Sequence, residues 1–148
     1  MPQVSSLEIV PILNAELHSV WPFVKVGLEE IKTRWPVDFL PEDVFTALRN
    51  NNAELVIAQR GDRLIAYFIA YKQFRPWSNL PEYFTWILWS LNMLDREPED
   101  EEARGKIIDF IKARARQLGC VEIACRSPRK GLGKMGFVPY MIEYRLKI

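Results

Sequence analysis

The sequence has few of the residues that build metal centres, disulfides or histidine-based catalytic sites. Among its 148 residues there are one histidine, His18, and two cysteines, Cys120 and Cys125. The cysteines lie five positions apart in a segment that we expect to be one strand, where their Cα atoms would be about 16 Å apart and their side chains would face opposite ways. The sequence therefore predicts no disulfide between them, no metal site and no Ser-His-Asp triad.

Long apolar runs and a strong net charge are also missing. The longest apolar run, residues 83–94, is shorter than the stretch of about 20 residues that a transmembrane helix needs. The N-terminus lacks the basic and then apolar order of a signal peptide. The formal net charge is only +1, which gives no general basic surface for nucleic acid. We therefore expect a cytoplasmic protein with neither a membrane nor a nucleic-acid partner.

Three glycines have the spacing of a dinucleotide-binding fingerprint, but their context excludes that function. They are Gly131, Gly133 and Gly136, and the chain ends twelve residues after the last of them. The fingerprint belongs to a strand-helix-strand unit of about thirty residues followed by an acidic ribose partner, which cannot fit in that tail.

The length and the apolar content suit one folded domain spanning residues 1–148. Hydrophobic periodicity and turn residues predict its elements in the order strand, helix, helix, hairpin, strand, helix, strand, short helix, strand. The expected segments are residues 7–12, 14–35, 41–49, 53–73 with Gly61 in the turn, 83–94, 99–118, 121–125, 131–136 and 140–148.

Three local features of these segments lead to specific expectations. Asn14 is expected to cap the first helix, and Pro22 to kink or split it. Both alternating sets of side chains in residues 83–94 are apolar, so this strand should be central and covered on both faces. Strict alternation would place one set on a single face of the sheet: Phe84, Trp86 and Leu88.

The order of elements and two segments, ARARQLGCVEIAC and GKMGFVPYMIEYRL, resemble the GNAT superfamily of N-acyltransferases. The resemblance implies an α/β (α+β) fold, with a mixed, mostly antiparallel sheet of about six to seven strands flanked by helices. The central two strands, residues 83–94 and 121–125, should run parallel, because a strand-helix-strand crossover gives parallel strands in nearly all cases. On this interpretation Gly136 ends a short helix and Phe137 fills the core.

The resemblance also implies where acetyl-CoA would bind. The family binds it between the two parallel strands, with the pyrophosphate on bare backbone at the start of the long helix. The residues expected to face the cofactor are Met93, Leu94, Arg104, Gly105 and Lys106. At the anchoring position and two of the glycine-like positions this sequence has carboxylates, at Glu99, Asp100 and Glu102, which repel pyrophosphate. We expect weak acetyl-CoA binding or none.

These carboxylates belong to a larger acidic block at the start of the long helix. It consists of Asp95, Glu97, Glu99, Asp100, Glu101 and Glu102. We expect the block to be mostly exposed and to stabilise the helix, because carboxylates interact favourably with the positive end of a helix dipole.

The catalytic residues that the resemblance implies are a carboxylate base and a tyrosine acid. Glu82 and Glu122, in or beside the two parallel strands, are the candidate bases. No tyrosine lies on the short helix, and Tyr140, on the last strand, is the candidate acid.

A narrower resemblance, to small GNAT-fold proteins of tailed bacteriophages, is based on VWPFVKVGLEEIK, LPEDVFTALRNNNAELVIAQ and RSPRKGLGKMGF. Two functions stay open. One is an acetyl-CoA-dependent N-acetyltransferase with a degenerate phosphate loop, acting on a small-molecule or protein amine. The other is a non-catalytic binding or structural protein with a protein partner, such as a virion-associated component. A phage-encoded chain would be located in the host cytoplasm or in the virion.

Overall fold

The computed structural model describes residues 6–35, 37, 39–75, 78–91, 98–126, 136–138 and 146, without the side chains of residues 98–100. Within these residues the chain forms five strands, three α-helices and one short 3-10 helix. In chain order they are β1 (Leu7–Ile12), η1 (Asn14–Glu16), α1 (Leu17–Arg34), α2 (Pro41–Arg49), β2 (Glu54–Arg60), β3 (Arg63–Phe74), β4 (Pro81–Ser90), α3 (Pro98–Gln117) and β5 (Glu122–Cys125).

The strands form one sheet in the order β1-β2-β3-β4-β5. Neighbouring strands are antiparallel except β4 and β5, which run parallel and are joined by α3. The predicted mixed, mostly antiparallel sheet with a parallel pair is confirmed. The predicted last strand, residues 140–148, lies outside the described residues apart from Leu146.

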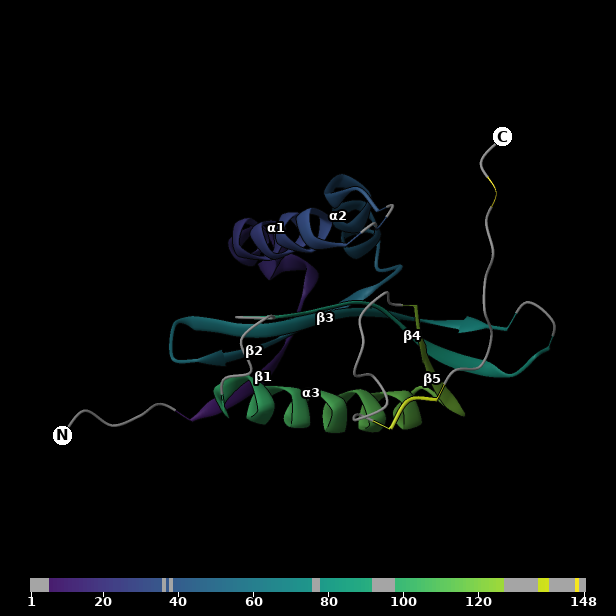
Figure 1. Ribbon diagram of the computed structural model, residues 1–148. Coiled ribbons are helices and arrows are strands. Elements are labelled where there is room, and N and C mark those ends of the chain that lie inside the picture. The colour runs from purple at the N-terminus through teal and green to yellow at the C-terminus, as the bar shows by residue number, and fades with distance from the viewer. Residues whose placement is uncertain are drawn as a thin grey trace.

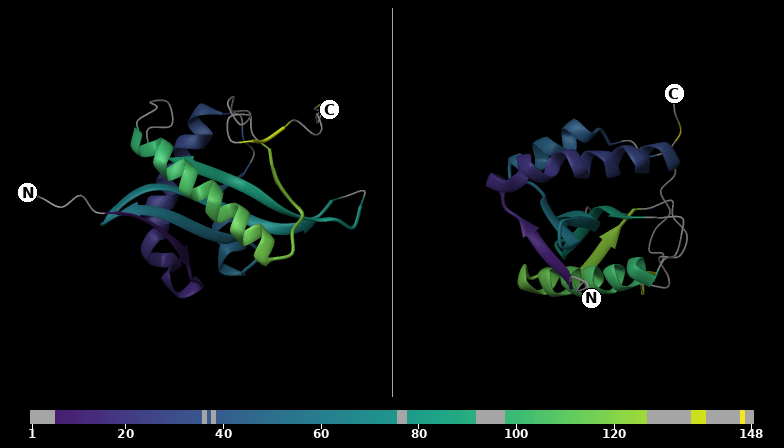
Figure 2. Two further views of the ribbon diagram at one scale, coloured as in Figure 1. Left: turned by 90° about the horizontal axis from the view of Figure 1, so that it is seen from below. Right: turned by 90° about the vertical axis from the view of Figure 1, so that its left-hand side faces the viewer.

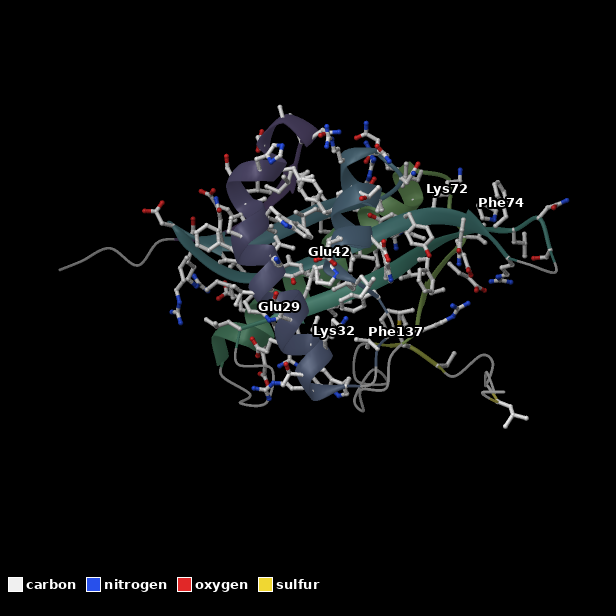
Figure 3. The ribbon with its side chains drawn as sticks, turned by 90° about the horizontal axis from the view of Figure 1, so that it is seen from above. Glu29, Lys32, Glu42, Lys72, Phe74 and Phe137 are labelled. Carbon is white, nitrogen blue, oxygen red and sulfur yellow. The ribbon has the colours of Figure 1, made fainter. Side chains whose placement is uncertain are left out.

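The helices cover the sheet on both faces. Figure 1 shows α1 and α2 on one face and α3 on the other, and Figure 2 shows α3 running across the strands. Two apolar cores result, one on each side of the sheet. The core under α3 includes Val56, Phe68, Tyr83, Ile107 and Ile111, and the core under α1 and α2 includes Val24, Leu28, Leu55, Tyr67 and Ile87. The expectation that residues of β4 are covered on both faces is confirmed.

Several local predictions are confirmed where the signal depends on a few neighbouring residues. β2 and β3 form the hairpin, and Gly61 in its two-residue loop has φ 57°, in the left-handed region that glycine tolerates best. α2 begins with Pro41 and buries Val44 and Leu48. Phe137 packs against the core under α3, as predicted. Gly136 has φ 91°, and the short helix that it was predicted to end lies outside the described residues.

Two predictions about the first helix were wrong: the cap at Asn14 and, of the two alternatives for Pro22, the split. Asn14 makes no capping hydrogen bond. It begins η1, and its side-chain amide donates to the carbonyl of Arg49 at the end of α2. α1 runs unbroken through Pro22. Proline has no backbone N–H, so the carbonyl of His18 loses its helical hydrogen bond. Because Pro22 and His18 are both exposed, water can bind that carbonyl instead.

The strict alternation expected in β4 was also wrong, because the strand contains a β-bulge. Ile69 of β3 is opposite Ile87, but Ala70 is opposite Thr85, so Trp86 is an extra residue in β4. Trp86 and Ile87 both pack toward α1 and α2, while Leu88 packs toward α3. A single inserted residue shifts every later side chain to the other face.

A close contact holds α1 against the sheet at Gly27. The buried hydroxyl of Tyr67 donates to the carbonyl of Val24 over 2.8 Å, and the Tyr67 ring stacks on Trp89 with 5.2 Å between centroids. A Cβ atom at Gly27 would lie 2.6 Å from the Tyr67 hydroxyl oxygen. Glycine is therefore required here by the space available between helix and sheet.

We expect Gly27→Ala to lower the free energy of unfolding by about 1–3 kcal/mol, the usual cost of overpacking a core. The Tyr67 ring is fixed by its hydrogen bond and by Trp89, so it cannot move aside without losing both contacts. Urea denaturation measures the difference. The matched control is Gly105→Ala, at an exposed position of α3. A Cβ there meets nothing within 4 Å, so alanine should stabilise the helix. Equal effects of the two substitutions would contradict this account of Gly27.

A polar network on the α3 face of the sheet joins α3 to β2 and β4. Arg114 binds both carboxylate oxygens of Glu54, at 2.8 and 3.0 Å, and the fully buried Tyr83 donates to the same carboxylate at 2.7 Å. Burial and the contact with Glu54 raise the pKa of the Tyr83 phenol far above its ordinary value of 10.0. The folded protein therefore keeps Tyr83 protonated where the unfolded chain would ionise it.

The raised pKa predicts a loss of stability in alkali. Below about pH 10 tyrosine is protonated in both states, and above it only the unfolded state ionises, so folding loses up to about 1.4 kcal/mol per pH unit. Tyr83→Phe should remove the part of this slope that Tyr83 contributes. The measurement is the unfolding free energy of both proteins between pH 8 and 11. Parallel pH profiles would mean that Tyr83 ionises equally easily in the folded protein.

The described part of the acidic block agrees with the prediction of exposure. Glu101 and Glu102 are the fourth and fifth residues of α3 and both are exposed. Glu102 forms an ion pair with Arg60 at the end of β2 and lies 3.8 Å from Lys106 one turn further along α3. Glu102 thus fixes the first turns of α3 to the sheet.

We expect Glu101→Gln combined with Glu102→Gln to lower the melting temperature at low salt. Each carboxylate contributes about 0.3–1 kcal/mol near the positive end of the helix dipole, and Glu102 also loses its ion pairs. Glu29→Gln, at an exposed position in the second half of α1, is the control. A higher melting temperature for the double variant would contradict a stabilising role of the block.

Candidate functional site

The feature that organises the site is the short parallel contact between β4 and β5. The pairing runs from Glu82 opposite Glu122 to Thr85 opposite Cys125 and stops there. β4 continues to Ser90, and within the described residues its positions 86–90 have no partner in β5. We call this point, after Thr85 and Cys125, the fork. The bulge at Trp86 falls directly after it.

A strand that loses its neighbour exposes backbone N–H and C=O groups that need other partners. A bulge at the same place bends the strand and changes the direction of its side chains, and bulges are frequent next to active sites. Among the described residues, the fork is therefore a position where backbone groups of β4 have no partner strand on the side of β5.

The fork contains one buried hydroxyl without a hydrogen bond. Thr85 is only 5% exposed, and its Oγ1 has no hydrogen-bond partner among the described residues. Ala70, the residue opposite Thr85 in β3, belongs to the core under α3. Tyr83, two residues before Thr85 in β4, belongs to the same core, so the side chain of Thr85 faces α3. A buried hydroxyl left unpaired costs about 1–3 kcal/mol. Sequence analysis missed Thr85, because the orphaned state is visible only once the strands are paired.

Three aromatic rings lie beside the fork on the opposite face of the sheet. Tyr71 packs on Phe84 with 5.3 Å between ring centroids and meets Trp86 at 6.0 Å in an edge arrangement. The guanidinium of Arg126, the residue after β5, lies 5.5 Å from the centre of the Phe84 ring. Burial raises the pKa of Tyr71, an effect that Arg126 opposes and Glu82 reinforces. Tyr71 is thus a protonated hydroxyl next to the fork, and it too was missed by sequence analysis.

The two candidate bases are brought together by the sheet. Glu82 and Glu122 are register partners in β4 and β5, at the end of the paired segment remote from the fork. Gln73 donates to one oxygen of Glu82 at 2.7 Å, and Arg75 lies 3.6 Å from the other. Arg75 also forms an ion pair with Glu122. The side chain of Glu82 is nearly buried, whereas that of Glu122 is exposed.

This arrangement explains why two carboxylates can lie side by side. The positive charge of Arg75 lies between them and offsets their mutual repulsion. The separation along β4 from Glu82 to Thr85 is three residues, or about 10 Å at the usual rise of a strand. A carboxylate at that distance reaches the fork only through an intervening water molecule.

The candidate cofactor residues on α3 lie on different sides of the helix. Lys106 Nζ is 3.4 Å from the carbonyl oxygen of Leu7, so this side chain points to β1, at the other edge of the described sheet from β5. Arg104 is two positions earlier, about 200° away around the helix, and is turned away from β1. Gly105 faces solvent, with open space around its Cα. Of these three, Arg104 is the charged residue whose Cα lies on the side of α3 away from Lys106.

The other candidates fall outside this geometry or outside the described residues. Glu102 is on the same side of α3 as Lys106 and pairs with Arg60, so its charge is turned to β1 and β2. Met93, Leu94 and Tyr140 lie outside the described residues, as do the side chains of Glu99 and Asp100.

A separate hollow of about 420 Å³ lies away from the fork, between the end of β1, the end of α2, the start of β2 and α3. Its charged groups, Glu54 and Arg114, bind each other and Tyr83. Among the residues described, no group of three or more His, Cys, Asp or Glu side chains is placed to hold a metal ion. None of the described helices is long and apolar enough to cross a membrane.

The sequence matches no protein-family model, and no curated protein is significantly similar to it. Solved structures do match over nearly the whole chain. A ribosomal-protein-alanine N-acetyltransferase from Brucella melitensis biovar Abortus 2308 has a TM-score of 0.69 at 15% identity, with 97% of this chain and 99% of that chain covered. A predicted acetyltransferase with acetyl-CoA from Clostridium acetobutylicum has a TM-score of 0.71 at 14% identity, with 96% of each chain covered.

A transcriptional regulator from Bacillus halodurans C-125 is also similar, with a TM-score of 0.68 at 11% identity and coverage of 97% of this chain and 100% of that one. At such identities the similarity establishes the fold and leaves the activity open. The sheet, the parallel pair and the helices on both faces, together with these structural neighbours, show that the chain has the GNAT-like fold of N-acetyltransferases.

Proposed function

We propose that the chain is an acetyl-CoA-dependent N-acetyltransferase of the GNAT type with a degenerate phosphate loop, acting on a small-molecule or protein amine. The observation that carries the proposal is the fork: a parallel pair that ends at Thr85 and Cys125, directly before a bulge in β4. Beyond the fork, the backbone groups of β4 have no partner in β5 among the described residues. We propose that the extended thioester arm of acetyl-CoA binds to these groups, between the two strands.

The residues around the fork supply the functions that acetyl transfer to an amine requires. When bound, acetyl-CoA supplies an activated acetyl group on a thiol leaving group. The edge of β4 beyond Thr85 binds the extended arm, and Arg104 offers positive charge on the flank of α3 turned away from β1. Glu82 and Glu122 accept the proton of the attacking amine through water, and Arg75 holds both carboxylates in place. The amine nitrogen would bond to the acetyl carbon as the C–S bond breaks, and the departing thiolate would take its proton from Tyr140, the acid that the resemblance implies.

The weak point of this site is its phosphate end. Glu99 and Asp100 are the second and third residues of α3, where backbone N–H groups and the helix dipole would otherwise favour an anion. Glu102 contributes less to this repulsion than its position in the sequence implies, because its carboxylate faces Arg60. We therefore propose weak acetyl-CoA binding, with two carboxylates responsible.

The second candidate function is that of a non-catalytic GNAT-fold protein that binds a protein partner, such as a virion-associated component of a phage. The engagement of both candidate bases with Arg75 favours it, since a carboxylate held in an ion pair is a common structural device. The structural neighbour described as a transcriptional regulator is consistent with other uses of the same fold. Under either function we place the chain in the cytoplasm, or in the virion if it is phage-encoded.

We expect the unmodified protein to bind acetyl-CoA with a dissociation constant on the order of 1 mM, equivalent to about 4 kcal/mol. Glu99→Gln combined with Asp100→Gly should tighten binding at least about tenfold, because two like charges near the pyrophosphate are removed. Glu102→Gln is the matched control and should leave the affinity unchanged, since that carboxylate is turned to Arg60. Titration followed by 1H–15N NMR spectroscopy measures dissociation constants in this range.

The same titration separates the two functions. Shifts confined to residues of β4, β5 and the start of α3, with release of free CoA when amines are added, support the acetyltransferase. The alternative result is that no chemical shift changes at acetyl-CoA concentrations up to ten times the expected dissociation constant. If both the unmodified protein and the double variant behave in this way, the non-catalytic function is favoured.

A further inference from the structure

The hollow between the end of β1, the end of α2, the start of β2 and α3 has a size and a lining that suit a small molecule. Its volume of about 420 Å³ lies within the range of roughly 300–1,000 Å³ that is usual for ligand pockets. Its lining combines an apolar part, to which Leu17, Leu48 and Phe110 belong, with a polar part formed by Glu54 and Arg114. Ligand sites typically have this combination of an apolar wall and a few polar groups.

The ion pair between Glu54 and Arg114 is accessible at the wall of the hollow. The two side chains are each 32% exposed, and both residues line the hollow. A molecule in the hollow can therefore contact the charged atoms without any rearrangement of the core.

Arg114 has hydrogen-bond donors left over after its internal contacts. A guanidinium carries five N–H groups. Nε and Nη2 each donate to Glu54, at 2.8 and 3.0 Å, and Nη1 donates to the amide oxygen of Gln117 at 2.9 Å. One N–H on each terminal nitrogen thus has no partner among the described residues. Gln117, which also lines the hollow, adds the two N–H groups of its amide, because its oxygen is the atom bound to Arg114.

Unused donors of a guanidinium indicate a ligand with acceptor oxygens, and a carboxylate matches their spacing with two parallel hydrogen bonds. Glu54 already offsets the charge of Arg114. One arginine can nevertheless hold two carboxylates, as Arg75 does with Glu82 and Glu122 in the same protein. The apolar part of the lining requires that the rest of the ligand be hydrocarbon.

We propose that this hollow is a binding site for a small carboxylic acid with an apolar body, whose carboxylate accepts hydrogen bonds from the unused N–H groups of Arg114. The amide of Gln117 donates a further hydrogen bond to the carboxylate, and the hydrocarbon body packs on Leu17, Leu48 and Phe110. The inference is independent of the proposed acetyltransferase function, because none of the described residues at the fork lines the hollow.

Hydrocinnamate, a phenyl ring joined to a carboxylate by two methylene groups, is the probe. Hydrocinnamamide is the matched control ligand, since it has nearly the same shape without the charge. In a 1H–15N NMR titration of the full chain we expect hydrocinnamate to shift residues of the hollow, with a dissociation constant on the order of 1 mM, as is usual for a ligand of this size. The amide should bind about tenfold more weakly, because its hydrogen bonds to Arg114 are not assisted by a second charge.

Two single substitutions on α3 form a matched pair of variants. Gln117→Glu and Arg116→Gln each lower the net charge by one, at adjacent exposed positions. In Gln117→Glu the new carboxylate competes with the ligand for the N–H groups of Arg114, so the affinity for hydrocinnamate should fall at least about tenfold. Arg116 does not line the hollow, and Arg116→Gln should leave the affinity unchanged at physiological salt. Both variants keep the contacts between Glu54 and Arg114 that join α3 to β2.

Three results would overturn the inference. The first is the absence of shifts in the hollow at hydrocinnamate concentrations up to ten times the expected dissociation constant. The second is equal affinity for the acid and the amide, which would mean that Arg114 does not select the head group. The third is equal affinity of Gln117→Glu and the unmodified protein, which would place the carboxylate elsewhere. None of these results depends on acetyl-CoA, so the inference and the proposed function are tested separately.

Discussion

The parallel contact between β4 and β5 extends over four residue pairs, and the placement of Glu82, Glu122 and Thr85 follows from it. It sets Glu82 against Glu122 at one end and ends at Thr85 and Cys125 at the other. Parallel strands cannot be joined by a tight turn, so the chain must cross the sheet, and α3 is that crossing. The core under α3 and the fork thus have the same origin: one crossover that brings β5 beside β4 for a short distance.

Ion pairs formed by arginines join parts of this arrangement that the crossover brings together. Arg60 holds the start of α3 to β2 through Glu102, and Arg114 holds its other end to β2 through Glu54. Arg75 connects the end of β3 to β4 and β5 through Glu82 and Glu122. Each pair has at least one partly buried member, so its loss would leave a charge with reduced solvation. The carboxylates nearest the fork therefore have a structural role, whatever chemistry they perform.

The fold of this chain is supported by contacts that do not themselves form the fork. The docking of α1 through Gly27, Tyr67 and Trp89 lies on the opposite side of the sheet from α3, and Tyr83 with Glu54 and Arg114 lies toward the far end of α3. These contacts stabilise the same sheet with or without a ligand. Changes at the start of α3 can accumulate without loss of the fold, which is consistent with identities of 14–15% to acetyltransferases of similar structure.

The sequence by itself determined the elements whose causes are local. The turn at Gly61, the start of α2 at Pro41 and the crossover from β4 through α3 to β5 all follow from turn chemistry, helix-end preferences and chain handedness. It also placed Glu82 and Glu122 in or beside the two parallel strands, where the structure makes them register partners; their role as bases stays a prediction. Only the tertiary structure decided that Arg75 lies between them, that Glu102 turns to Arg60, and that Lys106 points to β1. The bulge at Trp86 and the unpaired hydroxyl of Thr85 belong to the same class, because both depend on how residues far apart in the sequence pair across the sheet, and no local pattern in the chain encodes that register.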